Sequence, residues 1–284
     1  IIPMFTKTNW EFHGEFHDFP ARNVLPKPYQ KPHPPLWVAC SNIQTIAKAG
    51  EWGMGALGFT FVNPEAARAW VHKYYNALLN EPGRLCEYPD NPNIAMVNGF
   101  MCAETDEEAR DKASGWTFFV FALGYYGREG IKAPGSGDLW KAYQDWKGSE
   151  QEAKALQSGL IGSPETIRKR LRMFEEAHVD QIILLNQAGK TSHQDICDSL
   201  KLFAAEVMPE FHERQPKQDA WKADVMSRRL VLEDIDTGAY NIFSHQNKDI
   251  VRLSPDELKA MMATKEAASA GGDLTASGDD NRQG

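Results

Sequence analysis

Four short apolar runs alternate with helix-like segments along residues 36–208, and this alternation limits the folds open to the chain. The runs cover residues 36–39, 56–61, 94–102 and 181–185. Each is followed by a segment whose apolar residues recur at the spacing of one helix face. Strands that alternate with helices form a parallel sheet covered by helices, so we expect an α/β fold.

The turn after the first run carries the strongest local signal. Pro32–Pro35 holds the approach extended, and Leu36–Ala39 is typical of a parallel strand covered on both faces. Ser41 and Asn42 both suit the N-cap of the helix that begins at Ile43. The unpaired N–H groups and the dipole at a helix start can bind a phosphate. Geometry alone favours the simpler alternative, in which Ser41 only caps its own helix, because caps outnumber anion sites.

Other helix starts carry similar capping residues. They are Asn63-Pro64-Glu65, Thr105 before three acidic residues, Ser163-Pro164-Glu165 and Ser192-His193-Gln194-Asp195. We expect the helix after Thr105 to continue to Tyr125 or Tyr126, although Gly115 weakens it. Its aromatic stretch from Trp116 to Tyr126 could line an apolar substrate pocket, and packing in a core or interface is the commoner use.

Three further segments lie outside the strand and helix pattern. Residues 10–16 predict a small hairpin around Gly14 with Phe12 and Phe16 as anchors. The Gly-rich loop at residues 133–137 lacks the Lys-Ser/Thr ending of a phosphate-binding loop, so we interpret it as a mobile connection. Residues 265–284 have almost no large apolar side chains and are expected to be disordered.

Composition excludes several classes of function. A net charge of −8 without a basic cluster argues against nucleic acid as a partner, and no apolar run is long enough to span a membrane. The four cysteines are widely spaced and match no zinc or redox motif, so they are interpreted as free thiols of a cytoplasmic protein. His13, His17 and His33 lack the spacing of a metal site, and no metal is expected.

Three segments resemble the bacterial luciferase-like, flavin-dependent monooxygenases, and they follow one another in the order of that family. They are Pro26–Ala39, Gly162–Leu185 and Gln187–Phe211, the last on its Gln-Ala-Gly start and its Ala205–Phe211 end. The resemblance implies a (β/α)8 TIM barrel, of which this chain holds only the last four βα units. Residues 1–212 would be that C-terminal half, residues 213–264 a helical or irregular extension, and residues 265–284 the tail. The chain does not begin with Met and is expected to be a fragment.

The resemblance also implies a function. It predicts a monooxygenase that uses reduced FMN and O2 on an organic substrate, with a flavin reductase as the supplier of FMN. The turn at Cys40-Ser41 would hold the flavin phosphate, and Thr45 either assists it or is only a helix-face residue. The catalytic His of the family belongs to the N-terminal half, so the catalytic residues are unknown and the fragment is expected to be inactive alone. Oligomers would form through the barrel helices.

The residues themselves agree with a flavin and argue against a hydrolase. In a parallel barrel the site lies at the carboxyl ends of the strands, where this chain places Asn186 and Gln187. This rim is polar and uncharged, and it has neither paired carboxylates nor a Ser-His-Asp set. Such a rim suits a flavin ring, which needs mainly orientation and hydrogen bonds. Two alternatives remain: a deazaflavin-dependent oxidoreductase that transfers hydride, and a non-catalytic half-barrel that binds a partner barrel.

Overall fold

The computed structural model describes residues 1–58, 64–80, 83–129, 138–186 and 191–236. Contacts divide the chain into two units, Ile1–Ser244 and His245–Gly284, and every element given below belongs to the first unit. Three predictions lie outside the described residues: the end of the second strand at 59–61, the Gly-rich loop at 133–137 and the tail at 265–284.

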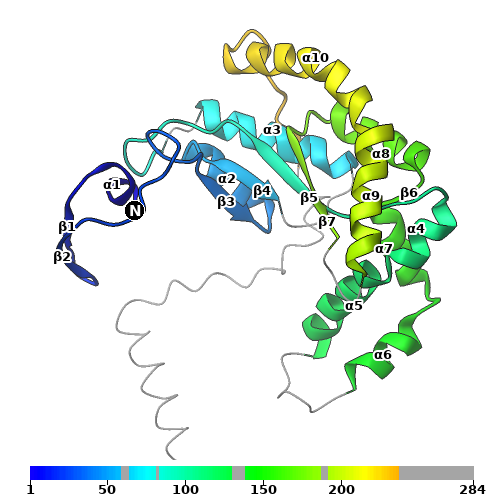
Figure 1. The fold of residues 1–284 in the computed structure, drawn as a ribbon. Coiled ribbons are helices and arrows are strands. Elements are labelled where there is room, and N and C mark those ends of the chain that lie inside the picture. Colours follow the sequence, from blue (N-terminus) through cyan, green and yellow to red (C-terminus); the bar gives the residue numbers. More distant parts are fainter. Residues whose placement is uncertain (59–63, 81–82, 130–137, 187–190, 237–284) are drawn as a thin grey trace, which may run out of the picture. The chain divides into compact units, whose positions relative to one another are not determined.

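Within the described residues a parallel sheet of five strands forms the centre of the first unit (Figure 1). Its strands are β3 (Trp37–Cys40), β4 (Gly55–Gly58), β5 (Ile94–Cys102), β6 (Leu160–Gly162) and β7 (Gln181–Leu185). The order runs β3-β4-β5, and both β6 and β7 also pair with β5. The predicted parallel α/β fold and its four strands are confirmed. The sequence did not reveal β6, because three residues are too few to show a period.

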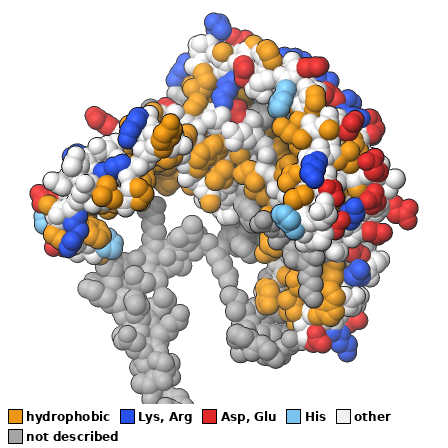
Figure 2. Space-filling view, viewed as in Figure 1, with side chains coloured by type: hydrophobic (Ala, Val, Ile, Leu, Met, Phe, Trp, Pro, Cys, Tyr) orange, Lys and Arg blue, Asp and Glu red, His pale blue; other side chains and the backbone are white. Residues whose placement is uncertain are grey.

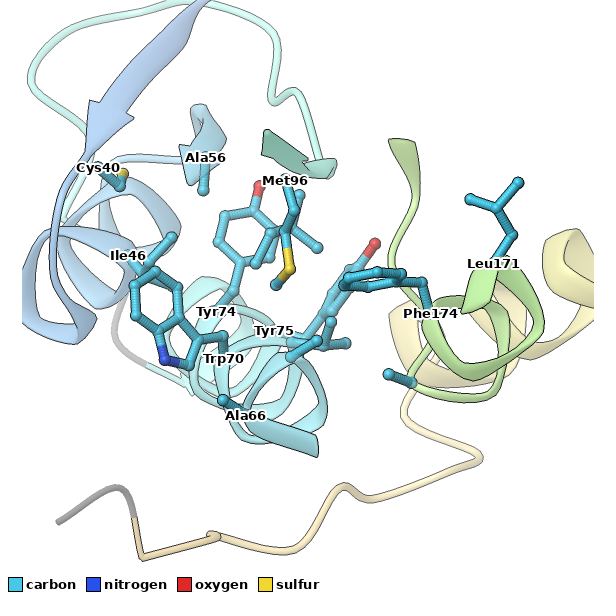
Figure 3. Close-up of a cluster of buried hydrophobic side chains, with 14 of the residues drawn as sticks. Cys40, Ile46, Ala56, Ala66, Trp70, Tyr74, Tyr75, Met96, Leu171 and Phe174 are labelled. Atoms are coloured by element: carbon cyan, nitrogen blue, oxygen red, sulfur yellow. The ribbon is translucent and has the colours of Figure 1, made fainter. Parts of the chain in front are cut away.

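Helices cover one face of this sheet. They include α2 (Ile43–Glu51), α3 (Pro64–Asn80), α8 (Pro164–Glu176) and α9 (His193–Glu206). The predicted buried stripe of α3 is confirmed, because Trp70, Val71, Tyr74 and Leu78 are all buried. Figure 3 shows how aromatic side chains of α3 lie beside Met96 of β5 and Phe174 of α8. Burial of this apolar surface is the main force that holds the helices on the sheet.

The opposite face of the sheet is open at its two edges. Ala39 of β3 and Gln181 of β7 are exposed, and Ile183 of β7 keeps 37% of its surface accessible. The prediction that the first strand is covered on both faces is therefore wrong for Ala39. At the centre, β5 is buried along its whole length, and so is the short strand β6 beside it. No described segment packs over this face at β3, so the apolar run there has a cover on its helix side alone.

The helix after Thr105 is divided in two. The elements are α4 (Asp106–Lys112) and α5 (Ser114–Glu129), so the prediction of one continuous helix is wrong. Ala113 leaves helical geometry between them, with φ −79° and ψ 13°. This break lets Trp116 pack under α7 (Glu150–Ser158) and donate its indole N–H to the Ala155 carbonyl oxygen at 3.0 Å.

Core packing accounts for the buried part of the aromatic stretch in α5. Phe121 lies against Tyr143 and Trp146 of α6 (Leu139–Trp146), with ring centroids 5.5 and 5.4 Å apart. Leu123 and Tyr126 remain largely exposed. Figure 2 shows hydrophobic side chains gathered over α5 and over the neighbouring strands of the sheet.

The N-terminal residues form a short helix, α1 (Ile2–Thr6), and an antiparallel hairpin of β1 (Trp10–His13) and β2 (Asp18–Arg22). The predicted hairpin is confirmed, and the Gly14 N–H donates to the His17 carbonyl oxygen at 2.9 Å. The two expected anchors are wrong, because Phe12 and Phe16 are 43% and 71% exposed. Phe12 is not an anchor in a core but stacks on Trp10 at the surface of the hairpin, with ring centroids 5.8 Å apart.

The last described helix is α10 (Met208–Met226), which begins with Pro209 in its first turn. It runs without a break through residue 212, where the sequence placed a domain boundary; the division into 1–212, 213–264 and 265–284 stays a prediction. Beyond α10 the chain returns to α3, where the Glu233 carbonyl oxygen lies 3.0 Å from Nδ1 of His72. No helix in the described ranges is long and apolar enough to cross a membrane.

Candidate functional site

The strands β3, β4 and β7 end along the same stretch of β5. Cys40 lies opposite Gly58, and Gly58 lies opposite Met96. On the other side of β5, Asn98 lies opposite Leu184. The residues that follow these strands therefore share one edge of the sheet, which is where parallel α/β enzymes bind their ligands.

Asn42 caps the helix that follows β3. Its side-chain oxygen accepts a hydrogen bond from the Thr45 N–H at 2.9 Å, and the Thr45 hydroxyl oxygen accepts one from the Asn42 N–H at 3.3 Å. The same hydroxyl donates to the Asn42 carbonyl oxygen at 2.8 Å. This reciprocal pair is a capping box. The alternative in which Ser41 caps α2 is therefore wrong, and the Thr45 hydroxyl is committed to the cap.

The Ser41 side chain does not stabilise any element in the described part of the chain. Its side chain is exposed, and no hydrogen bond involves it there. The N–H groups of Ile43 and Gln44 lie in the first turn of α2, where an α-helix supplies no acceptor. A hydroxyl, free N–H groups and the positive end of the helix dipole thus occur together at this turn, and all three favour an anion.

Cys40 is buried beneath the same turn and belongs to the core (Figure 3). Its Sγ lies 3.2 Å from the Val38 carbonyl oxygen and 3.4 Å from that of Thr45. Burial raises the pKa of the Cys40 thiol to about 11. The thiol is therefore protonated at neutral pH and is neither a nucleophile nor a charge beside the turn.

Two amide side chains at this edge of the sheet have buried atoms without a hydrogen-bond partner among the described residues. One such atom is Nδ2 of Asn186, directly after β7, although the side chain as a whole is only half-buried. Asn98 of β5 is 1% exposed, and both Nδ2 and Oδ1 are unpartnered. The sequence analysis missed Asn98, although an asparagine inside the apolar run 94–102 was a signal. The predicted partner of Asn186, Gln187, lies outside the described residues.

The predicted cofactor residues fall into two groups. Cys40, Ser41 and Thr45 share the turn between β3 and α2, whereas Asn186 follows β7, and β4 and β5 separate β7 from β3. Among the described residues, no group of His, Cys, Asp and Glu side chains is arranged to hold a metal ion.

The histidines that were not expected to be catalytic have other contacts. His13 is exposed and pairs with Asp18 on the hairpin. Burial lowers the pKa of His72, which is bonded to the Glu233 carbonyl oxygen. His193 is exposed in the first turn of α9, and its Nε2 lies 3.4 Å from Sγ of Cys197.

A family model of luciferase-like monooxygenases matches residues 3–181, which is more than half of the 284 residues. The chain belongs to this family. The match begins near the first residue of this chain, and the TIM-barrel type of fold follows from it together with the parallel sheet.

Two curated proteins are similar to this member of the family. The oxygenase component of the flavin-dependent trigonelline monooxygenase of Acinetobacter baylyi is 23% identical over 215 residues, which are 73% of this chain and 57% of the relative. An uncharacterised protein of Bacillus subtilis is 24% identical over 173 residues, 60% of this chain and 48% of the relative. The chain thus spans about half the length of the curated relatives it matches.

Two solved structures share the fold. The monooxygenase RslO1 from Streptomyces bottropensis superposes with a TM-score of 0.51 at 20% identity, over 74% of this chain and 58% of its own. The oxygenating constituent of 3,6-diketocamphane monooxygenase from Pseudomonas putida, solved in complex with FMN, gives a TM-score of 0.51 at 18% identity, over 72% of this chain and 59% of its own.

Proposed function

We propose that this chain is the C-terminal part of a flavin-dependent monooxygenase that uses reduced FMN and O2 on an organic substrate. The free turn between β3 and α2 carries the proposal, because it offers an anion site at the edge of the sheet where the family is expected to bind its cofactor. The relative from Acinetobacter baylyi is named as a flavin-dependent oxygenase component, and the Pseudomonas putida structure contains FMN. The name of the first supports a flavin over a deazaflavin, and the second supports FMN as that flavin.

In this proposal the Ser41 hydroxyl donates a hydrogen bond to the FMN phosphate, and the N–H groups of Ile43 and Gln44 donate hydrogen bonds beside it. Asn42 and Thr45 act indirectly, because their capping box holds the first turn of α2 in place. Cys40 anchors the turn through its buried side chain. Charge-assisted hydrogen bonds of this kind are about twice as strong as neutral ones.

The flavin ring would lie across the same edge, toward the amides of Asn186 and Gln187. The buried, unpartnered Nδ2 of Asn186 fits such a role, since a flavin ring has carbonyl and nitrogen acceptors that could accept its proton. When bound, reduced flavin supplies the electrons that activate O2. The chain's own part is to bind the flavin, orient it and exclude water.

Helix α5 supplies a side chain that would help to exclude water from the site. Trp116 packs directly on Gly99 of β5, where there is no room for a Cβ atom. Leu185, at the end of β7, belongs to the same apolar cluster. These residues cover the central part of the sheet face that is open at its edges. They would form one wall of a site from which water is excluded.

The rest of the site would come from the other half of the barrel. In the described residues β3 and β7 each pair along one edge only. Four further βα units would pair with both edges, close the barrel and supply the catalytic His. We infer that residues 1–284 alone are inactive, that a flavin reductase delivers reduced FMN, and that the enzyme works in the cytoplasm as an oligomer formed through barrel helices.

The phosphate turn can be tested by Ser41→Ala in the full-length protein. We expect FMN binding to weaken by about 1–3 kcal/mol, the loss typical of a hydrogen bond to a charged group. Riboflavin, which has no phosphate, should bind almost as well as before. Isothermal titration calorimetry with both ligands measures the difference.

Gln44→Ala is the matched control. It removes an exposed side chain from the same turn but keeps the backbone N–H group, so it should leave the binding of both ligands almost unchanged. Equal losses of FMN and riboflavin in Ser41→Ala would argue against a phosphate contact. Tighter binding of a fluorescent deazaflavin than of FMN by the wild-type protein would favour hydride transfer.

A further inference from the structure

A cavity of about 270 Å³ lies between α4, α7, β6 and α8. Its lining consists of Arg110, Ala153, Leu156, Gln157, Ile161 and Arg170. None of these residues belongs to β3, α2 or β7, so the cavity is separate from the proposed flavin turn. Two arginines from different elements line this small space, and the proposed function has no use for either.

Arg170 reaches the cavity from α8 with its side chain half-buried. One terminal nitrogen, Nη1, donates to the carbonyl oxygens of Gly159 and Ile161, the latter at 3.3 Å. Within the described ranges Arg170 forms no ion pair. Burial lowers the pKa of the Arg170 guanidinium, nearby Asp106 raises it, and the charge of Arg110 lowers it. The two guanidinium groups are therefore close enough to repel each other.

Arg110 reaches the same cavity from α4. Its side chain is exposed, and no hydrogen bond or ion pair of Arg110 occurs in the part of the chain that the structure describes. Asp106, whose charge acts on both arginines, is hydrogen-bonded to other groups. It accepts from the Ser163 N–H at 2.7 Å and from the Thr166 hydroxyl at 3.0 Å, at the start of α8. Two guanidinium groups and this one carboxylate leave a net charge of about +1.

An oxyanion between the two arginines would offset their repulsion, because each guanidinium can donate several hydrogen bonds to it. A phosphate monoester has three terminal acceptor oxygens and a charge of about −1.5 to −2 at neutral pH, so it offsets two guanidinium groups more fully than a singly charged carboxylate does. Ala153, Leu156 and Ile161 add an apolar wall beside the charged end. We propose that this cavity binds a small phosphate monoester, with its phosphate between Arg110 and Arg170 and its organic part against the apolar wall.

The proposal can be tested in the full-length protein by calorimetric titration with inorganic phosphate and with butyl phosphate. Butyl phosphate should bind more tightly than inorganic phosphate, severalfold for each methylene that it buries against the apolar wall, because each buried methylene contributes about 0.8 kcal/mol. Arg110→Gln should weaken butyl phosphate binding by roughly tenfold or more, the loss expected for a hydrogen bond to a charged group. Because Arg110 is exposed and forms no hydrogen bond or ion pair in the described chain, this variant should keep the wild-type melting temperature.

Lys169→Gln is the matched control, since Lys169 is an exposed cation next to Arg170 that does not line the cavity. It should change the affinity by less than about twofold, the size of effect usual for an exposed charge. Arg110→Gln should cause the same loss in a Ser41→Ala background, in which the proposed flavin turn has lost its hydroxyl group. No binding, an equal loss in Arg110→Gln and Lys169→Gln, or a smaller effect of Arg110→Gln in the Ser41→Ala background would each overturn the proposal. The proposed monooxygenase function does not depend on the result.

Discussion

Two buried asparagines show how much the surroundings of a single residue decide. Asn91 is 6% exposed; its Nδ2 donates to the Leu36 carbonyl oxygen at 3.0 Å, and its Oδ1 accepts from Asn93. Asn98 is buried still more deeply, but it has no partner. A buried amide without a hydrogen bond costs about 1–3 kcal/mol, whereas a satisfied amide does not carry this cost.

We expect Asn98→Leu to stabilise the chain by about 1–3 kcal/mol, because leucine has the same branching and number of side-chain heavy atoms and removes the unsatisfied amide. For a chain of this size that corresponds to a rise in melting temperature of about 2–4 °C per kcal/mol. Asn91→Leu is the control and should lower the melting temperature. A loss of stability in both variants would show that Asn98 has a polar partner such as a buried water.

At the scale of elements, one carboxylate joins helix α10 to the sheet and to α3. Asp180, just before β7, accepts from the Ile94 N–H and from the Tyr75 hydroxyl, each at 2.8 Å. Its other oxygen accepts from Nζ of Lys222 on α10 at 2.9 Å. Both members of this ion pair are largely shielded from solvent. Three elements distant in sequence therefore depend on one side chain.

Asp180→Ala should destabilise the chain by about 3–5 kcal/mol, because it leaves the shielded Lys222 ammonium group without its counter-ion and the Ile94 N–H without its acceptor. Denaturation by urea, followed by circular dichroism, measures the loss. Glu150→Ala provides the comparison, since Glu150 pairs with Lys154 in full contact with solvent. That variant should change stability by no more than about 1 kcal/mol. Similar effects in the two variants would refute the role assigned to Asp180.

At the scale of the whole molecule, the open face of the sheet limits what this chain can bind. A bound cofactor or drug-sized ligand usually has about 70–90% of its surface buried, and the proposed turn and Asn186 supply only part of such a site. We expect residues 1–284 alone to bind FMN weakly or not at all and to have no monooxygenase activity. Adding the missing half, in the same chain or as a separate one, should restore binding.

Equilibrium dialysis combined with sedimentation measures this directly. The matched control is the full-length protein under the same conditions, which should bind one FMN per chain. If a monomer of residues 1–284 also binds FMN with full stoichiometry, the partial-barrel proposal is wrong.

Local patterns in the sequence determined the elements of this protein. The strands at 36–39, 94–102 and 181–185, the caps Thr105, Ser163 and Ser192, and the hairpin around Gly14 all depend on neighbouring residues, and all are present. The family could be inferred for a related reason, since its motifs are contiguous segments. Neighbouring residues were sufficient for the elements, and the resemblance of contiguous motifs was sufficient for the family.

The tertiary structure decided the properties that depend on residues far apart in the sequence. It divided the helix after Thr105 so that Trp116 could reach α7, and it left the face at Ala39 uncovered. It also brought Arg110 and Arg170 to one cavity. Burial, missing hydrogen-bond partners and repulsion between like charges arise only when distant segments meet, so no local pattern could have predicted them.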